Sequence, residues 1–599
     1  MRSGDTMTVN FLTGKELGVR KCSVVVVYDK NGSMAEYVMN PRETSAETDD
    51  YLEWSVAVPI YDSGLYWYRF KLITDEDTRI AGRDPAGSRA VLDETENWWQ
   101  ETVYQRCYEV PEWIEGGVFY HIFVDRFNAS GERIHMDGKI DRCDWGGMPV
   151  WQPDENGRIQ NNDFFGGNIR GIIEKLDYLE SLGVTCLYLS PVFSAYSNHK
   201  YDTSDYMTVD PMFGTEDDLA ELFAAAGARG MRVILDGVFA HTGSDSIYFD
   251  KAGRYGGGAY QDPDSKYRDW YSIKEDGTYE AWWGIDTLPR IRKESPSYRE
   301  FICGENGVAR KWLRLGSSGW RLDVADELPN LFLEELARAV KTEKPDSILL
   351  GEVWEDASNK IAYSERKNYF EGDKLDSVMN YPFRVGIISF VRYGDAYSLA
   401  ETVERIVENY PPEVTACLMN MLGTHDTERI LTALGGKDFG SDPPRDVVAG
   451  VKMTPEERER AVRLLKIASV LQMTLPGVPC VYYGDEAGTE GYKDPFNRTC
   501  FPWGNEDPDI MNWYRNIIRI RRSHAVYKTG RYRTAACVGG LYAFERYADG
   551  ERMVTAANCG EKEELLLLAG CWRDLLTGRE FRDNITLFPQ EVLLLEEIK

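Results

Sequence analysis

Several features that define whole classes of proteins are missing from this sequence. Positive charge is scarce: 69 Lys and Arg stand against 98 Asp and Glu, which gives a formal net charge of −29. An acidic surface repels phosphate backbones and anionic lipid headgroups, so we expect no nucleic-acid partner and no membrane-surface function. The 11 cysteines form no CxxC pair and follow no regular spacing. This argues against a disulfide framework and a zinc ribbon and favours a reducing compartment.

Long apolar runs and several catalytic signatures are also absent. The longest apolar stretch, residues 467–483, is broken by Gln472, Pro476 and Pro479, so we expect a buried helix followed by a strand and no membrane span. The first residues lack the apolar core of a signal peptide, which predicts a cytoplasmic protein. There is no HExxH zinc motif, no GxSxG nucleophile elbow and no phosphate-binding loop. Zinc hydrolases, serine hydrolases of that type and P-loop enzymes are therefore disfavoured.

The chain has 599 residues, more than one hydrophobic core supports, so several domains are expected. Residues 1–112 hold short alternating strands separated by turns and predict an N-terminal β-sandwich. In residues 113–526 short apolar strands alternate with helical segments, the pattern of a (β/α)₈ TIM barrel. Residues 527–599 return to short strands and predict a C-terminal β-sandwich.

The expected barrel strands number eight. They lie within residues 118–124, 184–189, 231–236, 319–323, 347–352, 375–379, 417–421 and 479–483. The connection after the third strand, about residues 243–295, is rich in Gly, Asp, Tyr and Trp. A connection of that length usually has its own structure and a function, so we expect an inserted domain there.

Polar side chains occur where these strands end. Asp236 ends the third strand, Arg321 and Asp323 the fourth, and Glu352 the fifth, while His425 and Asp426 follow the seventh. In such a barrel the carboxyl ends of the strands form the active-site face. Each carboxylate taken alone could cap a turn or pair with a cation. Burying several of them on one face is costly in free energy, which favours a functional reason.

Carboxylates, histidines, one arginine and many aromatic rings together suit the cleavage of a glycosidic bond. One carboxylate attacks the anomeric carbon, and a second carboxyl group, with a raised pKa, protonates the leaving oxygen. Aromatic faces stack on sugar rings, and imidazoles bind hydroxyl groups. The alternative from another class is a non-catalytic barrel that binds glycans.

Six motifs, in order along the chain, carry a resemblance to a known family. They are SNHKYDT (197–203), DGVFAH (236–241), GWRLDVADE (319–327), GEVW (351–354), GTHDTER (423–429) and YYGDE (482–486). With these motifs the chain resembles the α-amylase superfamily, most closely its cyclomaltodextrinase, neopullulanase and maltogenic amylase branch. The resemblance implies a retaining α-glucan hydrolase that acts on cyclodextrins, pullulan or malto-oligosaccharides and carries out some transglycosylation. The alternatives on the same scaffold are an α-amylase and a 4-α-glucanotransferase.

The resemblance also implies a role for each matched residue. Asp323 would be the nucleophile, Glu352 the acid/base, and Asp426 the group that grips the sugar hydroxyls in the transition state. Arg321 is expected to keep Asp323 ionised, and Glu352 needs surroundings that raise its pKa. The other positions expected to bind substrate are His199, Tyr201, Asp236, His241, Trp283, Glu327, His425, Asp494 and Arg498.

One departure from the motifs concerns calcium. Ala240 stands before His241 where many relatives carry an Asn that binds the ion, and a methyl group cannot coordinate a hard cation. We therefore expect no required cofactor and no metal ligands at the usual site, although Asp125 and Asn128 match the region of another calcium site of this branch. The expected ligand is an α-glucan oligosaccharide. The branch often packs its N-terminal domain over a partner's barrel, which implies a homodimer through residues 1–110.

Overall fold

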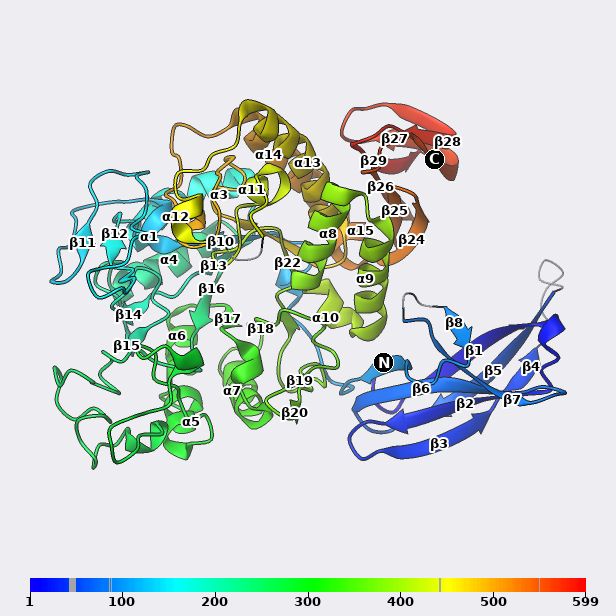
Figure 1. Ribbon diagram of the computed structural model, residues 1–599, viewed down its shortest axis with the longest axis horizontal. Coiled ribbons are helices and arrows are strands. Elements are labelled where there is room, and N and C mark those ends of the chain that lie inside the picture. Colours follow the sequence, from blue (N-terminus) through cyan, green and yellow to red (C-terminus); the bar gives the residue numbers. More distant parts are fainter. Residues whose placement is uncertain (43–49, 86, 88, 441–442, 549, 599) are drawn as a thin grey trace.

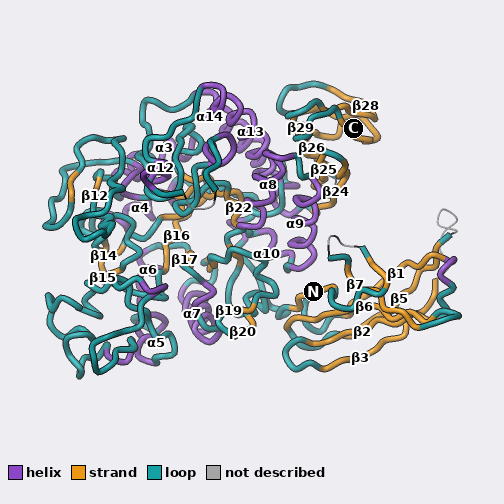
Figure 2. Tube along the Cα trace, viewed as in Figure 1, coloured by secondary structure: helices purple, strands orange, loops and turns teal. Residues whose placement is uncertain are grey.

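The computed structural model describes residues 1–42, 50–85, 87, 89–440, 443–548 and 550–598 (Figure 1). Figure 2 separates a helix-rich centre from two strand-rich ends of the chain. Helix α9 (Ala396–Asn409) contacts strand β9 (Trp99–Val103) of the N-terminal part and strand β24 (Arg531–Val538) of the C-terminal part. The two terminal β-regions therefore dock against the same side of the central barrel (Figure 1).

The barrel consists of eight parallel strands. In their hydrogen-bonded order they are β10 (Phe119–Ile122), β13 (Cys186–Leu189), β16 (Arg232–Gly237), β17 (Gly319–Leu322), β18 (Ile348–Gly351), β21 (Ser377–Val378), β22 (Met419–Met421) and β23 (Val478–Tyr482). Strand β10 also pairs with β23, and a bridge between Met379 and Met419 closes the ring. Each strand overlaps a predicted segment, so the TIM-barrel prediction is confirmed.

Helices cover the outside of the barrel. They include α2 (Ile169–Glu174), α3 (Leu176–Leu182), α4 (Glu216–Ala228), α5 (Pro296–Cys303), α6 (Val308–Leu315), α7 (Asn330–Glu343), α8 (Tyr381–Tyr393), α10 (Pro412–Ala416), α11 (Ile430–Gly435), α13 (Pro455–Thr474) and α14 (Pro508–Ser523). Helix α13 begins at a capping box, in which Thr454 and Glu457 satisfy each other's backbone N–H groups. It ends at Thr474, and β23 starts at Val478, so the apolar run 467–483 is a helix followed by a strand. No helix in the described ranges is both long and apolar enough to span a membrane.

The insertion after β16 runs to the start of α5, and the structure describes all of it. Its regular elements are the 3₁₀ turns η4 (Arg268–Trp270) and η5 (Trp282–Gly284). Tyr248, Phe249 and Trp270 are buried and continuous with the barrel core. A bridge between His241 and Arg290 ties the end of the insertion to the exit of the third barrel strand. The insertion therefore holds η5 over the carboxyl ends of the strands.

The two terminal regions are antiparallel β-structures. The N-terminal region pairs β1 (Thr6–Gly14), β5 (Tyr51–Pro59) and β4 (Asn40–Arg42) in one sheet, and β3 (Ser33–Val38), β2 (Lys21–Tyr28), β6 (Gly64–Ile73), β7 (Thr78–Arg83) and β8 (Ala90–Leu92), with β9 against β6, in another. The C-terminal sheet contains β24, β25 (Leu541–Ala548), β26 (Glu551–Asn558), β29 (Glu591–Ile598), β27 (Glu564–Asp574) and β28 (Glu580–Leu587). These sheets fit flanking β-sandwich domains, so the predicted fold class is confirmed. The predicted domain limits at 112/113 and 526/527 stay predictions.

Candidate active site

The predicted strand-end residues meet around one cavity of about 740 Å³. The predicted site residues that line it are Asp323, Glu352, Asp426, His199, Tyr201, His241, Trp283, His425, Asp494 and Arg498. Asp236, Arg321 and Glu327 are buried and do not line this cavity. Each contacts a residue that lines the cavity: Asp236 contacts Tyr201, Arg321 contacts Asp323, and Glu327 contacts Trp283. The predicted site residues thus form two layers, an upper layer that lines the cavity and a lower layer buried beneath it.

The register of three neighbouring strands places the acidic groups side by side. Asp236 pairs with Arg321 across β16 and β17, and Leu322 pairs with Gly351 across β17 and β18, so Asp323 and Glu352 follow adjacent strand ends. Gly319 makes the second pairing possible: its φ is +149°, and a Cβ there would stand 2.1 Å from the carbonyl oxygen of Ile348. Only glycine fits at this close approach.

Arg321 is the centre of the lower layer, and its side chain is fully buried. Its Nη1 lies 2.9 Å from Oδ1 of Asp236 and 3.0 Å from Oδ1 of Asp323, and its Nη2 lies 2.9 Å from Oε2 of Glu352. One guanidinium group thus contacts both predicted catalytic carboxylates. Tyr188 donates a further hydrogen bond to Asp236 at 2.6 Å.

Burial dominates the protonation of this cluster. It raises the pKa of Asp323 well above the ordinary value, and the guanidinium of Arg321 only partly offsets the effect. Arg321 therefore acts on this pKa in the expected direction, and its charge opposes the effect of burial. Burial and the charge of Glu352 also raise the pKa of Asp426 to about 7. The carboxyl groups around Arg321 interact strongly, so they titrate as a set and not one by one.

Two contacts orient Glu352. Its Oε2 accepts a hydrogen bond from the backbone N–H of Val324 at 2.8 Å, and its Oε1 accepts one from Nε1 of Trp354 at 3.1 Å. The Trp354 ring stacks on Tyr381 with centroids 4.0 Å apart. Val324 has φ 39° and ψ 57°, a left-handed conformation that β-branched residues rarely adopt. Backbone strain is thus located between the predicted nucleophile and the predicted acid.

The histidines of the site are neutral donors and acceptors. His241 donates from Nε2 to the carbonyl oxygen of Tyr201 at 3.1 Å, and the rings of Tyr201 and His425 stack at 5.1 Å. Burial lowers the pKa of both His199 and His241 to about 4. His121, the third residue of β10, was not among the predicted site residues. It stacks on Tyr188 at 4.3 Å and meets His425 edge-on at 5.3 Å. The predicted strand 118–124 places His121 in mid-strand, so the position of strand ends gave no signal for it.

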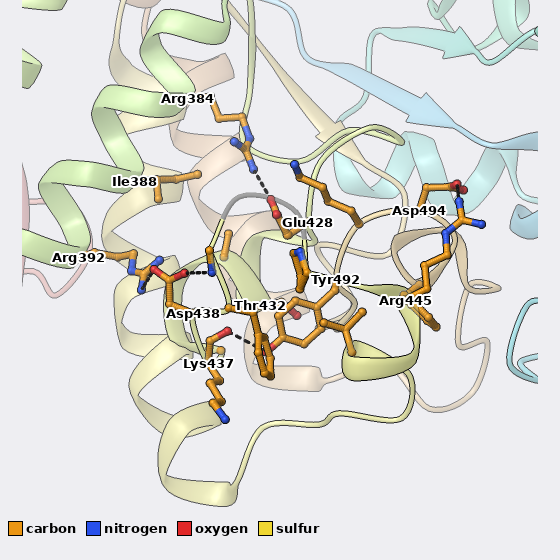
Figure 3. A pocket seen from close by; sticks show the side chains of 18 residues that line it. Arg384, Ile388, Arg392, Glu428, Thr432, Lys437, Asp438, Arg445, Tyr492 and Asp494 are labelled. Atoms are coloured by element: carbon orange, nitrogen blue, oxygen red, sulfur yellow. Dashed lines mark hydrogen bonds and ion pairs between the residues drawn. The ribbon is translucent and has the colours of Figure 1, made fainter. Parts of the chain in front are cut away.

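Asp494 and Arg498 form one wall of the cavity. Arg498 contacts Oδ1 of Asp494 through Nη1 at 2.7 Å and donates from Nε to the carbonyl oxygen of His425 at 3.0 Å. The second oxygen of Asp494 is held by Nη2 of Arg445 at 2.7 Å. Figure 3 shows Arg445 reaching Asp494 at the edge of a second cavity of about 410 Å³. Arg445 was not among the predicted site residues; it lies in the connection between β22 and β23 and belongs to no motif.

The opposite wall gathers aromatic residues on Glu327. Its Oε1 accepts hydrogen bonds from Nε1 of Trp282 at 2.9 Å, from Nε1 of Trp283 at 3.0 Å and from the hydroxyl of Tyr363 at 3.0 Å. Trp283 is 77% exposed and lines the cavity. Glu327 was predicted to bind substrate, and the structure places it behind the indoles, where it orients them.

The side chains considered for calcium have partners within the protein. One carboxylate oxygen of Asp125 lies 2.7 Å from Nε of Arg126, and its oxygens also accept backbone N–H groups of Phe165 and Gly166. Asn128 points its amide N–H₂ at the carbonyl oxygen of Gly171. Within the described ranges, no group of three or more His, Cys, Asp or Glu side chains is placed to hold a metal.

Comparisons with known proteins extend this picture. The family model described as "Alpha amylase, catalytic domain" matches residues 121–529. The amylopullulanase of Thermoanaerobacter thermohydrosulfuricus is 37% identical over 598 residues, which cover 91% of this chain and 39% of that protein. The chain thus spans well under half the length of that relative.

Two further similar proteins are matched over most of their own length and most of this chain. Neopullulanase 2 of Thermoactinomyces vulgaris is 34% identical over 513 residues, 82% of this chain and 79% of that protein. A solved structure of a cyclomaltodextrinase superposes with a TM-score of 0.70 at 28% identity and covers 100% of this chain and 97% of its own. The matched family model begins in the first barrel strand and includes every residue of the two-layered site. On this match the chain belongs to the alpha-amylase family.

Proposed function

We propose that this protein is a retaining α-glucan hydrolase that acts on cyclodextrins, pullulan or malto-oligosaccharides. The observation that carries the proposal is the contact of Arg321 with both Asp323 and Glu352 at a cavity lined by aromatic and neutral imidazole rings. Two carboxyl groups beside one anomeric carbon are what double displacement needs. The printed names of the relatives, amylopullulanase, neopullulanase and cyclomaltodextrinase, support the same substrate class.

The first step forms a covalent intermediate. The carboxylate of Asp323 attacks C1 of the sugar, the bond from C1 to the glycosidic oxygen breaks, and Glu352 gives its proton to that oxygen. Asp426 holds two sugar hydroxyls during the distortion of the ring. The neutral histidines His199, His241 and His425 line the same cavity and bind further hydroxyls.

The second step releases the sugar. Glu352, now ionised, takes a proton from water, the water oxygen bonds to C1, and the ester bond to Asp323 breaks. Two inversions retain the α configuration. A sugar hydroxyl that replaces water gives transglycosylation by the same electron movements.

Substitution of the acid/base tests the proposal. Glu352→Gln is expected to reduce the hydrolysis of maltotriose at least ~10³-fold while binding, measured by calorimetry, is retained. The matched control is Asp346→Asn, which precedes the same strand at the opposite end of the barrel and is expected to keep full activity. Full turnover by Glu352→Gln, or a first product of β configuration in an NMR time course, would refute the mechanism.

The product profile separates the hydrolase from its alternatives. β-Cyclodextrin, pullulan and soluble starch are incubated with the enzyme at low and high maltose concentration, and the products are sized. Hydrolysis products should dominate at low maltose. Exclusive transfer would favour the 4-α-glucanotransferase, and preference for starch an α-amylase. Binding without turnover of any substrate would favour the glycan-binding alternative.

Three further properties belong to the proposal. We propose that no metal is required, because Asp125 is already paired with Arg126. Dialysis against EDTA is therefore expected to leave the specific activity unchanged. A loss of activity that Ca²⁺ restores would overturn this point.

All 11 cysteines are free, which suits a cytoplasmic location. We also propose a homodimer through the N-terminal β-region.

A further inference from the structure

The hairpin of β19 (Ile361–Ala362) and β20 (Glu365–Arg366) follows the strand that carries Glu352. Its two central residues, Tyr363 and Ser364, both have positive φ, at 52° and 63°. A two-residue hairpin turn of type I′ requires this conformation and normally uses Asn or Gly. Neither residue here is Asn or Gly, so other contacts must hold the turn.

The tip of the hairpin contacts the aromatic wall of the cavity. The Tyr363 hydroxyl donates to the same oxygen of Glu327 that accepts the indole N–H of Trp283, each at 3.0 Å. Trp283 itself has a left-handed backbone, with φ 50°. One carboxylate oxygen thus links a strained hairpin to a strained, exposed indole that lines the cavity.

The base of the hairpin is held by the N-terminal β-region. Arg366 donates from Nε to Oδ2 of Asp29 at 3.0 Å and from Nη2 to Oδ1 at 3.1 Å, a bidentate pair. Asp29 follows strand β2, and Nε1 of Trp67 in β6 fixes its position with a hydrogen bond of 2.9 Å. In Figure 1 the hairpin lies at the edge of the barrel that faces the N-terminal sheets.

We propose that the N-terminal β-region tunes how its own barrel binds the leaving group and the acceptor. Asp29 holds Arg366, the hairpin presents Tyr363 to Glu327, and Glu327 orients Trp283. Trp354 and Val324, which contact Glu352, line the same cavity as Trp283. The proton donor stands beside the leaving oxygen, so this wall faces the leaving group, and Asp494 and Arg498 face the other end of the substrate. Asp29, Arg366 and Tyr363 are positioning residues, and the inference rests on the proposed function.

Kinetics on substrates of increasing length test the inference. Asp29→Asn removes the negative charge opposite Arg366, and Tyr363→Phe removes only the hydroxyl. Both are expected to raise KM for maltopentaose ~3- to 10-fold, the net effect of one lost hydrogen bond, to change kcat less than ~2-fold, and to shift the sizes of the products. The double variant Asp29→Arg with Arg366→Asp restores an opposite-charge pair and should recover much of the KM.

The matched control breaks a different contact between the same two parts of the chain. Arg2 contacts Glu413 at 2.7 Å, away from the hairpin, and Glu413→Gln is expected to leave KM and product sizes unchanged. Thermal unfolding of each variant shows whether it is folded. An unchanged KM in a folded Asp29→Asn enzyme, or an equal effect of Glu413→Gln, overturns the inference alone. A wild-type enzyme that cleaves no α-glucan overturns the proposed function.

Discussion

Arg321 shows how a single residue organises the electrostatics of the site. Its buried guanidinium contacts Asp236, Asp323 and Glu352. Such a cluster is costly in free energy when it is complete and more costly when its cation, Arg321, is removed. The sequence indicated that these groups share a face, while the direction of the pKa of Asp323 depended on a degree of burial that strand-end spacing does not encode.

Removal of this cation gives the first prediction. Arg321→Met leaves buried carboxylates unpaired and is expected to lower the free energy of unfolding by ~3–5 kcal/mol, measured in a urea titration. The control Arg392→Met loses a long contact of 3.7 Å to Asp438 and a cation–π contact with the exposed ring of Tyr393 at 5.1 Å, and it should cost less than ~1 kcal/mol. Equal stability of Arg321→Met and wild type would show that the cluster is protonated throughout.

A buried histidine gives a prediction about pH. The pKa of His241 is about 4 in the folded protein and ordinary, near 6.5, in the unfolded chain. As the pH falls below 6.5, the unfolded chain protonates His241 before the folded protein does. The stability that the neutral imidazole contributes is therefore present above pH 6.5 and is lost as the pH falls toward 4. The loss is ~3 kcal/mol at most.

Unfolding titrations at several pH values measure this effect. His241→Gln keeps a side-chain donor for the carbonyl of Tyr201 and should flatten the fall in stability between pH 6.5 and 4. His135→Gln, an exposed site, serves as the control and should retain the wild-type slope. A slope that His241→Gln leaves unchanged would place the acid sensitivity elsewhere.

At the scale of elements, the sequence predicted the strands and helices well and their connections poorly. All eight barrel strands lie where alternation of apolar runs and helices indicated, because that pattern is local. The amphipathic segment 169–182 forms two helices, α2 and α3, which are separated at Lys175. The hairpin β19–β20 was not predicted, since its turn uses Tyr363 and Ser364 and no Asn or Gly.

The connection after β17 offers a prediction at this scale. Val324 is left-handed there, which costs a β-branched residue ~1–2 kcal/mol, and Asn tolerates that conformation better. Val324→Asn is therefore expected to raise the free energy of unfolding by ~1 kcal/mol. Loss of the apolar contacts of the valine side chain reduces this gain. Val385→Asn changes an exposed valine inside α8 and should bring no gain. A less stable Val324→Asn protein would mean that packing of the valine outweighs the strain.

At the scale of the whole molecule, contacts between distant parts of the chain complete the structure. The hydroxyl of Thr102 donates to the carbonyl oxygen of Asn409 at 2.6 Å, and Arg2 and Asp29 contact Glu413 and Arg366. These contacts hold the N-terminal β-region against its own barrel.

Assembly is the prediction that belongs to this scale. A homodimer should sediment at twice the monomer mass at micromolar concentration and dissociate on dilution. Sedimentation velocity over a hundredfold range of concentration checks this, with the monomeric Mr calculated from the sequence as reference. A single monomeric species throughout would contradict the proposed homodimer.

The sequence alone determined the barrel, its flanking β-regions and the chemical types that stand at the strand ends, because periodicity and strand termini are local properties of the chain. Only the tertiary structure decided that Arg445 holds Asp494, that His121 supports His425, and that Asp29 reaches the hairpin beside the cavity. Those pairs join segments far apart in the sequence, and their distances depend on how loops close over the barrel. Burial, which sets the pKa of Asp323, likewise exists only once the chain has folded.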